Sequence, residues 1–392
     1  MKFKKIFDPI HKYMEFEPEL IKIIDTSEFQ RLRDIKQLGL CYYVFSGASH
    51  NRFEHSLGVA HLSGMLIKRL KQNQPELNIT DRQVLLVKIA GLIHDLGHGP
   101  YSHFYDNIFI KSIKHDECVN LNHEGRSIII FEHMIKKYKL NINDNEFKMI
   151  KEMINPSNES GFLYQIVANN KSKIDTDKFD YLLRDIYNLG LPYSFEYYKF
   201  IDNMKVIDNT ICYSDKLVYD IYDLFSLRLK LHKNIYNHHT VNSIELMLLD
   251  IFNLANNKYR LFNRIFNIDE FIMLNDNIID LIYYCYIDDK DIDEAKKIIK
   301  DIKERKLYKL VDEILVNKKD IPIGILKKYN DFKDNTYVYK FFTINYCNGI
   351  NNPIKNIDFY NKDTKIKINY DNISKIIPNI FEEIYLRIYK KN

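Results

Sequence analysis

Histidine and carboxylate side chains gather between Gly91 and Asp106, where the sequence reads GLIHDLGHGPYSHFYD. Three histidines and two aspartates fall within this short stretch. The adjacent imidazole and carboxylate of His94 and Asp95 are ligands that suit a divalent transition metal, or Mg²⁺ and Mn²⁺. Two such groups do not complete a metal site, so we expect further ligands from other parts of the chain.

The apolar run VLLVKIA, residues 84–90, indicates the helix that positions this pair. Its length and composition predict a buried helix, and Gly97 and Gly99 then interrupt the pattern. We therefore expect His94 and Asp95 near the end of the helix. His98 follows one turn after His94 and shares its face if the helix persists.

Two further residues extend the pair into a recognisable pattern. His55 lies 39 positions before His94, and Asp177 follows in the segment IDTDKFDY. Each residue alone is a weak signal, because carboxylates usually lie on the surface and a single helical histidine is rarely a ligand. Together, His55, His94, Asp95 and Asp177 form the H…HD…D pattern of HD phosphohydrolases, whose four ligands come from separate helices.

Composition limits the class of protein. The chain has 392 residues, of which 46% are hydrophobic and 28% charged, as in globular proteins with one large domain or two. The net charge of +4, from 57 basic and 53 acidic residues, is too balanced to indicate nucleic-acid binding by itself. Nucleic acid as a partner is thus only weakly supported.

The five cysteines are widely spaced and include no C-x-x-C pair, which argues against a zinc ribbon or a disulfide framework. No long apolar segment indicates a signal peptide or a membrane span. We expect an intracellular protein with no membrane partner. The sequence does not distinguish the cytoplasm, the nucleus and a viral replication site.

Hydrophobic periodicity predicts a mainly α fold with a small C-terminal α/β lobe. The H…HD…D pattern implies that the helical part is an HD-domain phosphohydrolase core. We expect a catalytic core over residues 1–256 and a helical and α/β lobe over residues 257–392 that serves oligomerisation. Helices are predicted over residues 20–38 with a break at 25–27, 162–167, 179–189, 217–256 and 380–389. Extended segments are predicted over residues 42–45, 337–346, 357–360 and 364–370.

The residues around the HD pattern make the comparison specific. GASHNRFEHSLGV, AGLIHDLGHGPYSHF and IDTDKFDYLLRD closely resemble the SAM-and-HD-domain deoxynucleoside triphosphate triphosphohydrolases. SLRLKLHKNIYNHH, DPIH, IIDTSEFQRLRDIKQLG and NPIKNIDFYNKDTK match the same family. The resemblance covers nearly the whole chain, and we expect the SAM domain to be missing here.

This resemblance implies the reaction. Members of the family cleave a deoxynucleoside triphosphate into deoxynucleoside and inorganic triphosphate, by attack of water at the α-phosphorus. The implied cofactors are a divalent metal at the HD site, which could be Fe, Mn, Zn or Mg, and Mg²⁺ on the triphosphate. Such a metal binds the α-phosphate and lowers the pKa of a bound water.

The departing 5′-oxygen needs a proton, and the family match places a group of side chains in the same cavity: His98, His103, His123 and Asp106. Pairing with Asp106 would orient His123 and keep it protonated. Which histidine acts as the acid is left open. Three further histidines are expected to be structural: His11, His50 and His61.

The substrate residues are implied by the same match. Arg52, Lys178 and Tyr181 fall at triphosphate contacts, where two cations and a hydroxyl suit a polyanion. The alternative for Arg52 is a bridge between helices.

The sugar contacts follow in the same way. Gln37 and Asp185 match residues that bond the 3′-hydroxyl, and Tyr236 matches a tyrosine under the ribose that excludes a 2′-hydroxyl. Arg228 and His232 lie four residues apart on the same helical face. Core packing is the alternative reading of Tyr236.

Regulation is where the chain departs from the family, which assembles tetramers when nucleotides bind between subunits. The matching residues at these nucleotide sites are Lys4, Asp25, Gln30, Arg33, Arg305, Lys309 and Lys362. However, Phe7 stands in place of an asparagine, and Lys205 in place of a base-stacking arginine. A guanine-nucleotide activator and a homo-oligomer, dimer or tetramer, are therefore expectations that these changes leave open.

Two other functions remain as alternatives. One is an HD phosphatase for another nucleotide, against which Gln37, Asp185 and Tyr236 argue. The other is a nucleotide or single-stranded nucleic-acid binding scaffold with weak or no catalysis, whose basic residues would bind phosphates at a subunit seam. The complete set of metal and histidine residues favours the metal-dependent triphosphohydrolase.

Overall fold

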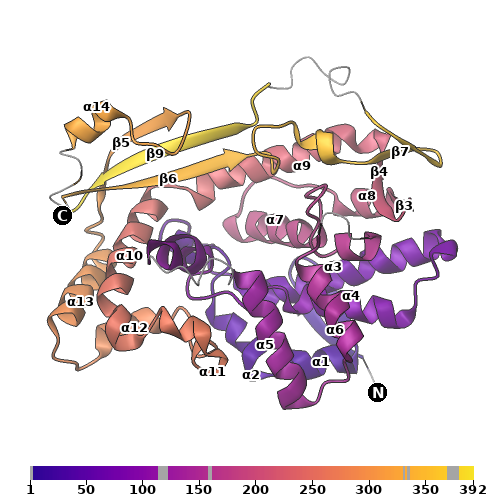
Figure 1. Ribbon diagram of the computed structural model, residues 1–392, viewed down its shortest axis with the longest axis horizontal. Helices are drawn as coiled ribbons and strands as arrows, with labels where there is room; N and C mark the ends of the chain where they lie inside the picture. Colours follow the sequence, from indigo (N-terminus) through magenta and orange to yellow (C-terminus); the bar gives the residue numbers. More distant parts are fainter. Residues whose placement is uncertain (1–2, 114–121, 158–160, 330–331, 333–335, 369–378) are drawn as a thin grey trace.

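The computed structural model describes residues 3–392 except 114–121, 158–160, 330–331, 333–335 and 369–378. The predicted fold class is confirmed, because the chain is mainly α with small sheets added to the helices. In Figure 1 the sheet of β5, β9 and β6 lies along the upper side, α3, α4 and α6 lie at one end, and α10, α12 and α13 at the other. Within the described residues, none of the helices has the length and apolarity that crossing a membrane requires.

The chain begins with an antiparallel hairpin of β1 (Lys4–Asp8) and β2 (Lys12–Phe16). One Asp8 carboxylate oxygen accepts the backbone N–H groups of Ile10 and His11, at 2.8 and 2.9 Å, and this closes the turn. The sequence predicts the turn at Asp8-Pro9 but not the strands, because five-residue strands carry too few positions for a clear pattern.

The helices of the N-terminal half are α1 (Pro18–Ile24), α2 (Ser27–Gln30), α3 (Arg52–Asn73), α4 (Asp81–Ile93), α5 (His123–Tyr138), α6 (Asp144–Ile154), α7 (Thr176–Leu189) and α8 (Tyr197–Asp202). Side-chain caps fix where several of them begin. The Thr26 hydroxyl caps α2, and reciprocal capping boxes start α3 at Asn51 and α4 at Thr80. These caps place His55 in the first turn of α3 and His94 directly after α4.

The long helical segment predicted over residues 217–256 is interrupted in the structure. It divides into α9 (Val218–Leu231), a π-helical turn (His232–Tyr236) and α10 (His239–Tyr259). The π turn adds a residue to the helical repeat, so the side chains after Leu231 rotate relative to an uninterrupted helix. This interruption determines the direction in which Tyr236 points.

Two larger sheets complete the fold. The first joins β3 (Met204–Ile207), β4 (Thr210–Ser214), β7 (Phe359–Asn361) and β8 (Thr364–Ile366) in that order, and β4 and β7 run parallel. The second has β9 (Glu382–Lys390) between β5 (Lys309–Val316) and β6 (Tyr337–Asn345), all antiparallel. The remaining helices are α11 (Ile268–Phe271), α12 (Ile278–Tyr284), α13 (Lys290–Lys303) and α14 (Ile323–Lys328).

The helix predicted over residues 380–389 is wrong, because this segment forms β9, the central strand of its sheet. Glu382 and Glu383 favour a helix locally, but β5 and β6 supply hydrogen-bond partners on both edges of the segment. The β-branched and aromatic residues that follow fit this setting, as β propensity depends on neighbours that the local sequence does not show.

Shorter segments also differ from prediction. Residues 42–45 were expected to be extended, whereas Gly39–Tyr43 forms a 3₁₀ helix. The helix predicted over residues 162–167 is reduced to a 3₁₀ helix, Phe162–Gln165. The strand predicted over residues 364–370 is confirmed for Thr364–Ile366, and residues 369 and 370 lie outside the described part of the chain.

The hydrophobic core continues across residue 256, because Phe252 and Ile282 belong to the same buried cluster. A buried carboxylate strengthens this connection. Asp276 accepts the backbone N–H groups of Tyr101 and Lys36, at 2.6 and 2.9 Å. Burial raises the pKa of Asp276 to about 6. The division into units of 1–256 and 257–392 stays a prediction.

Asp276→Asn is expected to lower the free energy of unfolding by about 1–3 kcal/mol, because the new amide nitrogen would face one of two buried N–H donors. The matched control is Asp280→Asn, whose side chain is 62% exposed. It should change the same quantity by less than about 0.5 kcal/mol. Urea denaturation of the three proteins measures the difference, and equal losses in both variants would contradict this role of Asp276.

Candidate metal centre and active site

His55, His94 and Asp95 converge from two helices that run antiparallel. His55 comes from the first turn of α3, and His94 and Asp95 follow the last residue of α4. Their ligand atoms all lie within 4.8 Å of one another. The Nε2 atoms of His55 and His94 each lie 3.4 Å from a carboxylate oxygen of Asp95. This cluster is a candidate divalent-metal site.

Both imidazoles are held in the orientation that a metal ligand needs. The Nδ1 atom of His94 lies 2.9 Å from the carbonyl oxygen of Gly91, and Nδ1 of His55 lies 2.8 Å from a carboxylate oxygen of Asp180. Donation from Nδ1 leaves the Nε2 lone pair free, as in histidines that bind metals. Both Nε2 atoms are buried and have no hydrogen-bond partner, so the donor set fits a divalent cation.

Asp177 supplies the fourth residue of the pattern, from the first turn of α7. Its Oδ1 atom lies 3.1 Å from Nε2 of His55 and 3.5 Å from Nε2 of His94. The Asp177 side chain is 34% exposed, whereas His55 is fully buried. All four residues of the H…HD…D pattern thus meet at one point, and the site opens on the Asp177 side.

The electrostatic balance of this group favours a cation. Burial alone would lower the pKa of His55, but the carboxylates of Asp177 and Asp180 outweigh it and raise the pKa to about 9. Burial would likewise raise the pKa of Asp95, yet the charge of Arg52 and the nearby histidines hold it well below the ordinary value. Ionised carboxylates therefore surround the two Nε2 atoms.

A second group of histidines lies beside the metal ligands. The ring of His98 stacks on His123 with centroids 4.1 Å apart, and His103 meets both rings edge-on. His98 does not continue the helix of His94 as the periodicity suggested, because α4 ends at Ile93. A turn instead brings His98 Nε2 to 3.2 Å from an Asp95 oxygen.

Asp106 connects this group of histidines to Arg126, a residue that the sequence did not indicate. The Nδ1 atom of His123 lies 3.2 Å from Asp106, as expected, and the Arg126 guanidinium bonds the other oxygen of the same carboxylate. Burial would raise the pKa of Asp106, but the hydrogen bond with His123 and the charge of Arg126 hold it well below its ordinary value. Asp106 thus stays ionised beside His123.

Arg52 is almost entirely buried, and it bonds protein groups in three directions. It donates to Asp95 at 2.6 Å, to the hydroxyl of Ser102 at 3.0 Å and to the carbonyl oxygen of Gln37 at 3.3 Å. Arg52 therefore connects separate segments, as the alternative interpretation of the sequence expected. Two of its N–H groups are left over for a ligand, and its contact with a triphosphate stays a prediction.

Lys178, Tyr181 and Arg228 line the open side near Asp177. Lys178 pairs with Asp175 at 3.0 Å, the N-cap residue of its own helix. Burial would lower the pKa of Lys178, but Asp175 raises it above its ordinary value, so the amine stays charged. Arg228 reaches the carbonyl oxygen of Asn345 in β6 at 3.2 Å. Lys178 and Tyr181 thus adjoin the metal-ligand candidate Asp177, and Arg228 lies beside Tyr181.

The residues expected to bind the sugar form a separate cluster. The Tyr236 hydroxyl donates to one oxygen of Asp185, and His50 bonds the other oxygen at 2.7 Å. His232 meets Tyr236 edge-on with centroids 4.8 Å apart. The side-chain oxygen of Gln37 is buried without a hydrogen-bond partner. His50, expected to be only structural, therefore positions Asp185.

Comparison with known proteins now adds to this geometry. The HD domain family matches residues 52–185, which include every metal-ligand candidate. The deoxynucleoside triphosphate triphosphohydrolase SAMHD1 of Homo sapiens is 38% identical over 99% of this chain and 70% of its own length. The SAMHD1 homolog of Dictyostelium discoideum is 38% identical over 98% of this chain and 77% of its own length. The SAMHD1 of Bos taurus is 37% identical over 99% of this chain and 75% of its own.

The chain belongs to the SAMHD1 family of HD-domain proteins. The resemblance expected from the sequence motifs is therefore confirmed. Tyr236 and Arg228 lie outside the matched HD domain but within the part shared with the SAMHD1 relatives, whereas their partners Asp185 and Tyr181 lie inside it.

The residues that match the nucleotide sites of the SAMHD1 family fall into separate groups. Lys4 lies 3.9 Å from Asp25, and Gln30 bonds Arg33 at 2.8 Å. The other three residues belong to the end of α13, to β5 and to the β7–β8 turn: Arg305, Lys309 and Lys362. In Figure 1, α13 and β7 lie at opposite ends of the molecule, so one copy of the chain does not bring these groups together.

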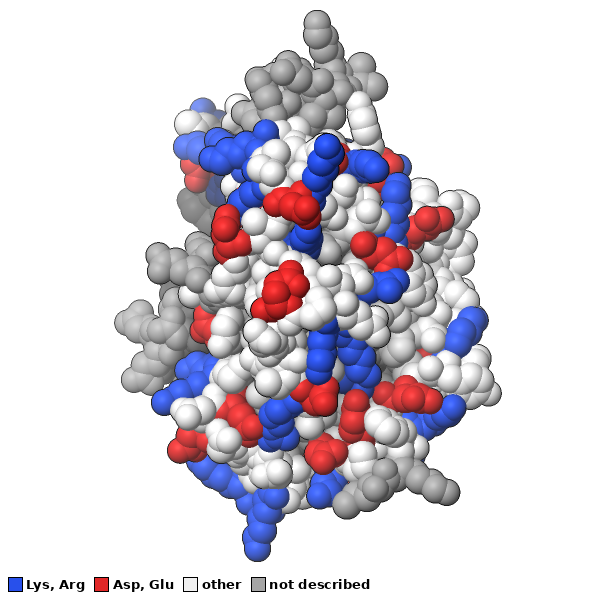
Figure 2. All heavy atoms as spheres, turned by 90° about the vertical axis from the view of Figure 1, so that its right-hand side faces the viewer, with Lys and Arg blue, Asp and Glu red and all other residues white. Residues whose placement is uncertain are grey.

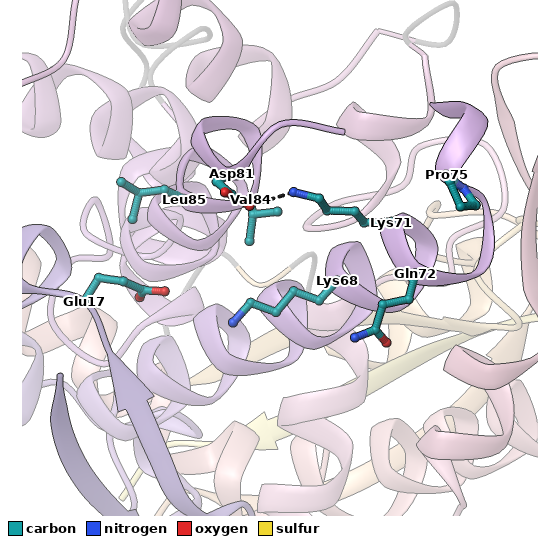
Figure 3. Close-up of a pocket in the computed structure, with 8 residues that line it drawn as sticks. All are labelled: Glu17, Lys68, Lys71, Gln72, Pro75, Asp81, Val84 and Leu85. Atoms are coloured by element: carbon teal, nitrogen blue, oxygen red, sulfur yellow. Dashed lines mark hydrogen bonds and ion pairs between the residues drawn. The ribbon is translucent and has the colours of Figure 1, made fainter. Parts of the chain in front are cut away.

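A cavity of about 660 Å³ lies apart from the candidate site (Figure 3). It is lined by Glu17, Lys68, Lys71, Gln72, Pro75, Asp81, Val84 and Leu85. Lys68 is 13 residues beyond His55 on α3, which is roughly 20 Å along a helix. Figure 2 shows a face on which basic and acidic side chains are interspersed. None of the residues that line the cavity is a candidate metal ligand.

His94→Ala is expected to reduce bound metal from about one ion per chain to less than a tenth, because it removes one of few converging ligands. The helical content should stay unchanged, since His94 follows the end of α4. The matched control is His133→Ala on α5, whose side chain lies 3.8 Å from Asp269. Elemental analysis together with circular dichroism checks both variants, and full metal occupancy in His94→Ala would refute the assignment.

Proposed function

We propose that this protein hydrolyses deoxynucleoside triphosphates to deoxynucleoside and inorganic triphosphate. One observation carries the proposal: in a chain similar to SAMHD1 over nearly its full length, four converging metal ligands adjoin Arg52 and Lys178. The relatives are named as deoxynucleoside triphosphate triphosphohydrolases. A second candidate function has no comparable support.

The reaction requires binding of the triphosphate and activation of water. A divalent metal held by His55, His94, Asp95 and Asp177, whether Fe, Mn, Zn or Mg, would supply a Lewis acid and an activated water at the α-phosphate. Arg52 and Lys178 provide positive charge for the triphosphate and its Mg²⁺, and the hydroxyl of Tyr181 adds a hydrogen-bond donor. Asp95 is oriented by Arg52, so this arginine also holds the metal ligand in place.

Proton delivery to the departing 5′-oxygen is assigned to the pair His103 and His123. His98 is less suited, because its side chain is fully buried and its Nε2 atom lies 3.2 Å from the metal ligand Asp95. The Nδ1 atom of His123 lies 3.2 Å from a carboxylate oxygen of Asp106, which orients the ring. His103 is exposed and meets His123 edge-on, 5.6 Å between centroids, so it can contact a ligand from the solvent side.

The preference for deoxyribose is assigned to the cluster of Tyr236, Asp185 and Gln37. Two hydrogen bonds fix the Asp185 carboxylate, which can still accept a bond from a 3′-hydroxyl. The same contact with Asp185 holds the Tyr236 ring, which would occupy the space of a 2′-hydroxyl. The unpaired oxygen of Gln37 is a further acceptor.

Hydrolysis in oxygen-18 water tests the proposed reaction. If water attacks the α-phosphorus and the bond from this phosphorus to the 5′-oxygen breaks, the label enters inorganic triphosphate. The deoxynucleoside then stays unlabelled. Chromatography that separates triphosphate from pyrophosphate, followed by mass spectrometry, identifies both products. Pyrophosphate with deoxynucleoside monophosphate, or label in the deoxynucleoside, would contradict the proposal.

Tyr236→Ala is expected to weaken discrimination against ribonucleotides roughly tenfold or more, since a single steric contact in a pocket is worth about 1–3 kcal/mol. Tyr236→Phe is the matched control, because it keeps the ring and removes only the hydroxyl that bonds Asp185. The ratio of kcat/KM for dGTP and GTP should fall in the first variant and persist in the second. A wild-type enzyme that hydrolyses both nucleotides equally would refute the steric role.

Assembly and activation are also proposed from the family. The group of Lys4, Asp25, Gln30 and Arg33 would bind a guanine nucleotide between copies of the chain in a dimer or tetramer. Phe7 is 61% exposed and packs edge-on against Tyr13 at 5.3 Å, so it offers apolar surface there in place of an amide. The activator is therefore expected to bind more weakly than in the family, or assembly to proceed without it.

Phe7→Asn should make assembly more dependent on GTP, because it restores hydrogen bonds worth about 1–3 kcal/mol, or one to two decades in affinity. Phe3→Asn is the control, since Phe3 is similarly exposed at 57% on the same segment. Sedimentation velocity and turnover across a GTP titration measure the effect. The same GTP dependence in wild type and Phe7→Asn would show that Phe7 does not face the nucleotide.

A further inference from the structure

A buried chain of ion pairs connects the N-terminal hairpin to the metal ligand His55. It begins at Asp8, where β1 ends, and passes through Arg184 to Asp180, both on α7. Asp180 then bonds Nδ1 of His55, the atom that sets the orientation of this ligand. His11 from the same hairpin turn bonds Asp180 as well.

Each pair of neighbouring side chains in this chain of ion pairs lies within hydrogen-bond distance. Arg184 donates to Asp8 at 2.8 Å and to both oxygens of Asp180, at 2.9 and 3.0 Å. Asp180 lies 2.7 Å from Nε2 of His11 and 2.8 Å from Nδ1 of His55. The side chains of His11, His55, Asp180 and Arg184 are all fully buried, so solvent does not weaken these contacts.

Gly58 on α3 makes room for this arrangement. A Cβ atom at Gly58 would lie 1.8 Å from an Asp180 oxygen and 2.7 Å from an Arg184 nitrogen. Only glycine lets α3 approach these two side chains so closely. The helix that carries His55 is therefore fitted to the same ion pairs that hold the hairpin.

We propose that the turn from Asp8 to His11 is part of the metal centre, with Asp8 and His11 as positioning residues for His55. This inference rests on the metal site of the proposed function. Arg184 and His11 hold Asp180, and the hairpin supplies His11 and Asp8. Asp8 is the nearer of two further carboxylates on Arg184, at 2.8 Å against 3.5 Å for Glu54. Docking of the hairpin and binding of the metal accordingly strengthen each other.

The size of the effect follows from general behaviour of metal sites. Loss of a partner that orients a ligating histidine costs about 10–100-fold in metal affinity. Asp8 acts one link further away, through Arg184, so we expect roughly tenfold. By thermodynamic reciprocity, the metal must then favour the docked hairpin over the undocked one by the same factor.

Asp8→Asn tests the positioning role without removing the side chain. The amide oxygen can still accept the turn N–H groups, whereas the amide cannot match the charge of Arg184. The control is Glu15→Gln, a carboxylate of the same hairpin that pairs with Lys5 on the surface at 3.0 Å. Electron paramagnetic resonance of free Mn²⁺ gives the metal Kd for the folded proteins, as judged by circular dichroism. We expect about a tenfold rise for Asp8→Asn and no change for Glu15→Gln.

Hydrogen exchange in the wild-type protein tests the coupling from the other side. Saturating Mn²⁺ should slow amide exchange in residues 4–16 about tenfold, while the amides of β5 keep their rates. This measurement decides the matter even if Asp8→Asn fails to fold. Unchanged exchange in the hairpin at full Mn²⁺ occupancy, or an unchanged Kd in a folded Asp8→Asn, would overturn the inference and leave the metal centre intact. A wild-type protein that binds no Mn²⁺ would remove the metal centre and the inference with it.

Discussion

The structure depends on holding several hydrogen-bond acceptors together in a buried place. Two imidazole Nε2 atoms and two carboxylates meet within 3.5 Å at the end of α4. The two ionised carboxylates repel each other, and a buried polar atom without a partner costs about 1–3 kcal/mol. Packing elsewhere must offset this cost. Helices α3 and α4 contribute to this packing, because their facing residues form part of the continuous hydrophobic core. The packed helices thus hold these groups in an arrangement that favours binding of a cation.

The two sides of this centre have different environments. His55 and Asp180 are closed off from solvent, while Asp177 is partly open and adjoins Lys178 and Tyr181. A closed side fixes the direction of ligands, because few rotamers fit a packed interior. An open side admits a charged ligand without a large rearrangement. This division separates the residues that hold the metal ligands from those that can meet a substrate.

The sequence predicts the position of His94 and Asp95 at the end of a helix, because an apolar helical run precedes them. His55 and Asp177 have no such local signal, and the H…HD…D pattern as a whole points to them. Residues whose roles depend on distant partners were not found. His11 and His50 bond carboxylates 169 and 135 positions away, and no local pattern reports such pairs. The helix predicted over residues 380–389 failed for a similar reason, since the strands that flank β9 are distant in sequence.

The bond from Arg228 to the backbone of Asn345 has a consequence for how this family can change. All four metal ligands lie within residues 52–185, whereas Arg228, Tyr236 and the β6 strand lie beyond them. The metal ligands therefore lie in one stretch, whereas the residues proposed to contact the substrate come from before it, from within it and from after it. Insertions or substitutions after α7 can therefore change Arg228, Tyr236 or the β6 strand without altering a metal ligand.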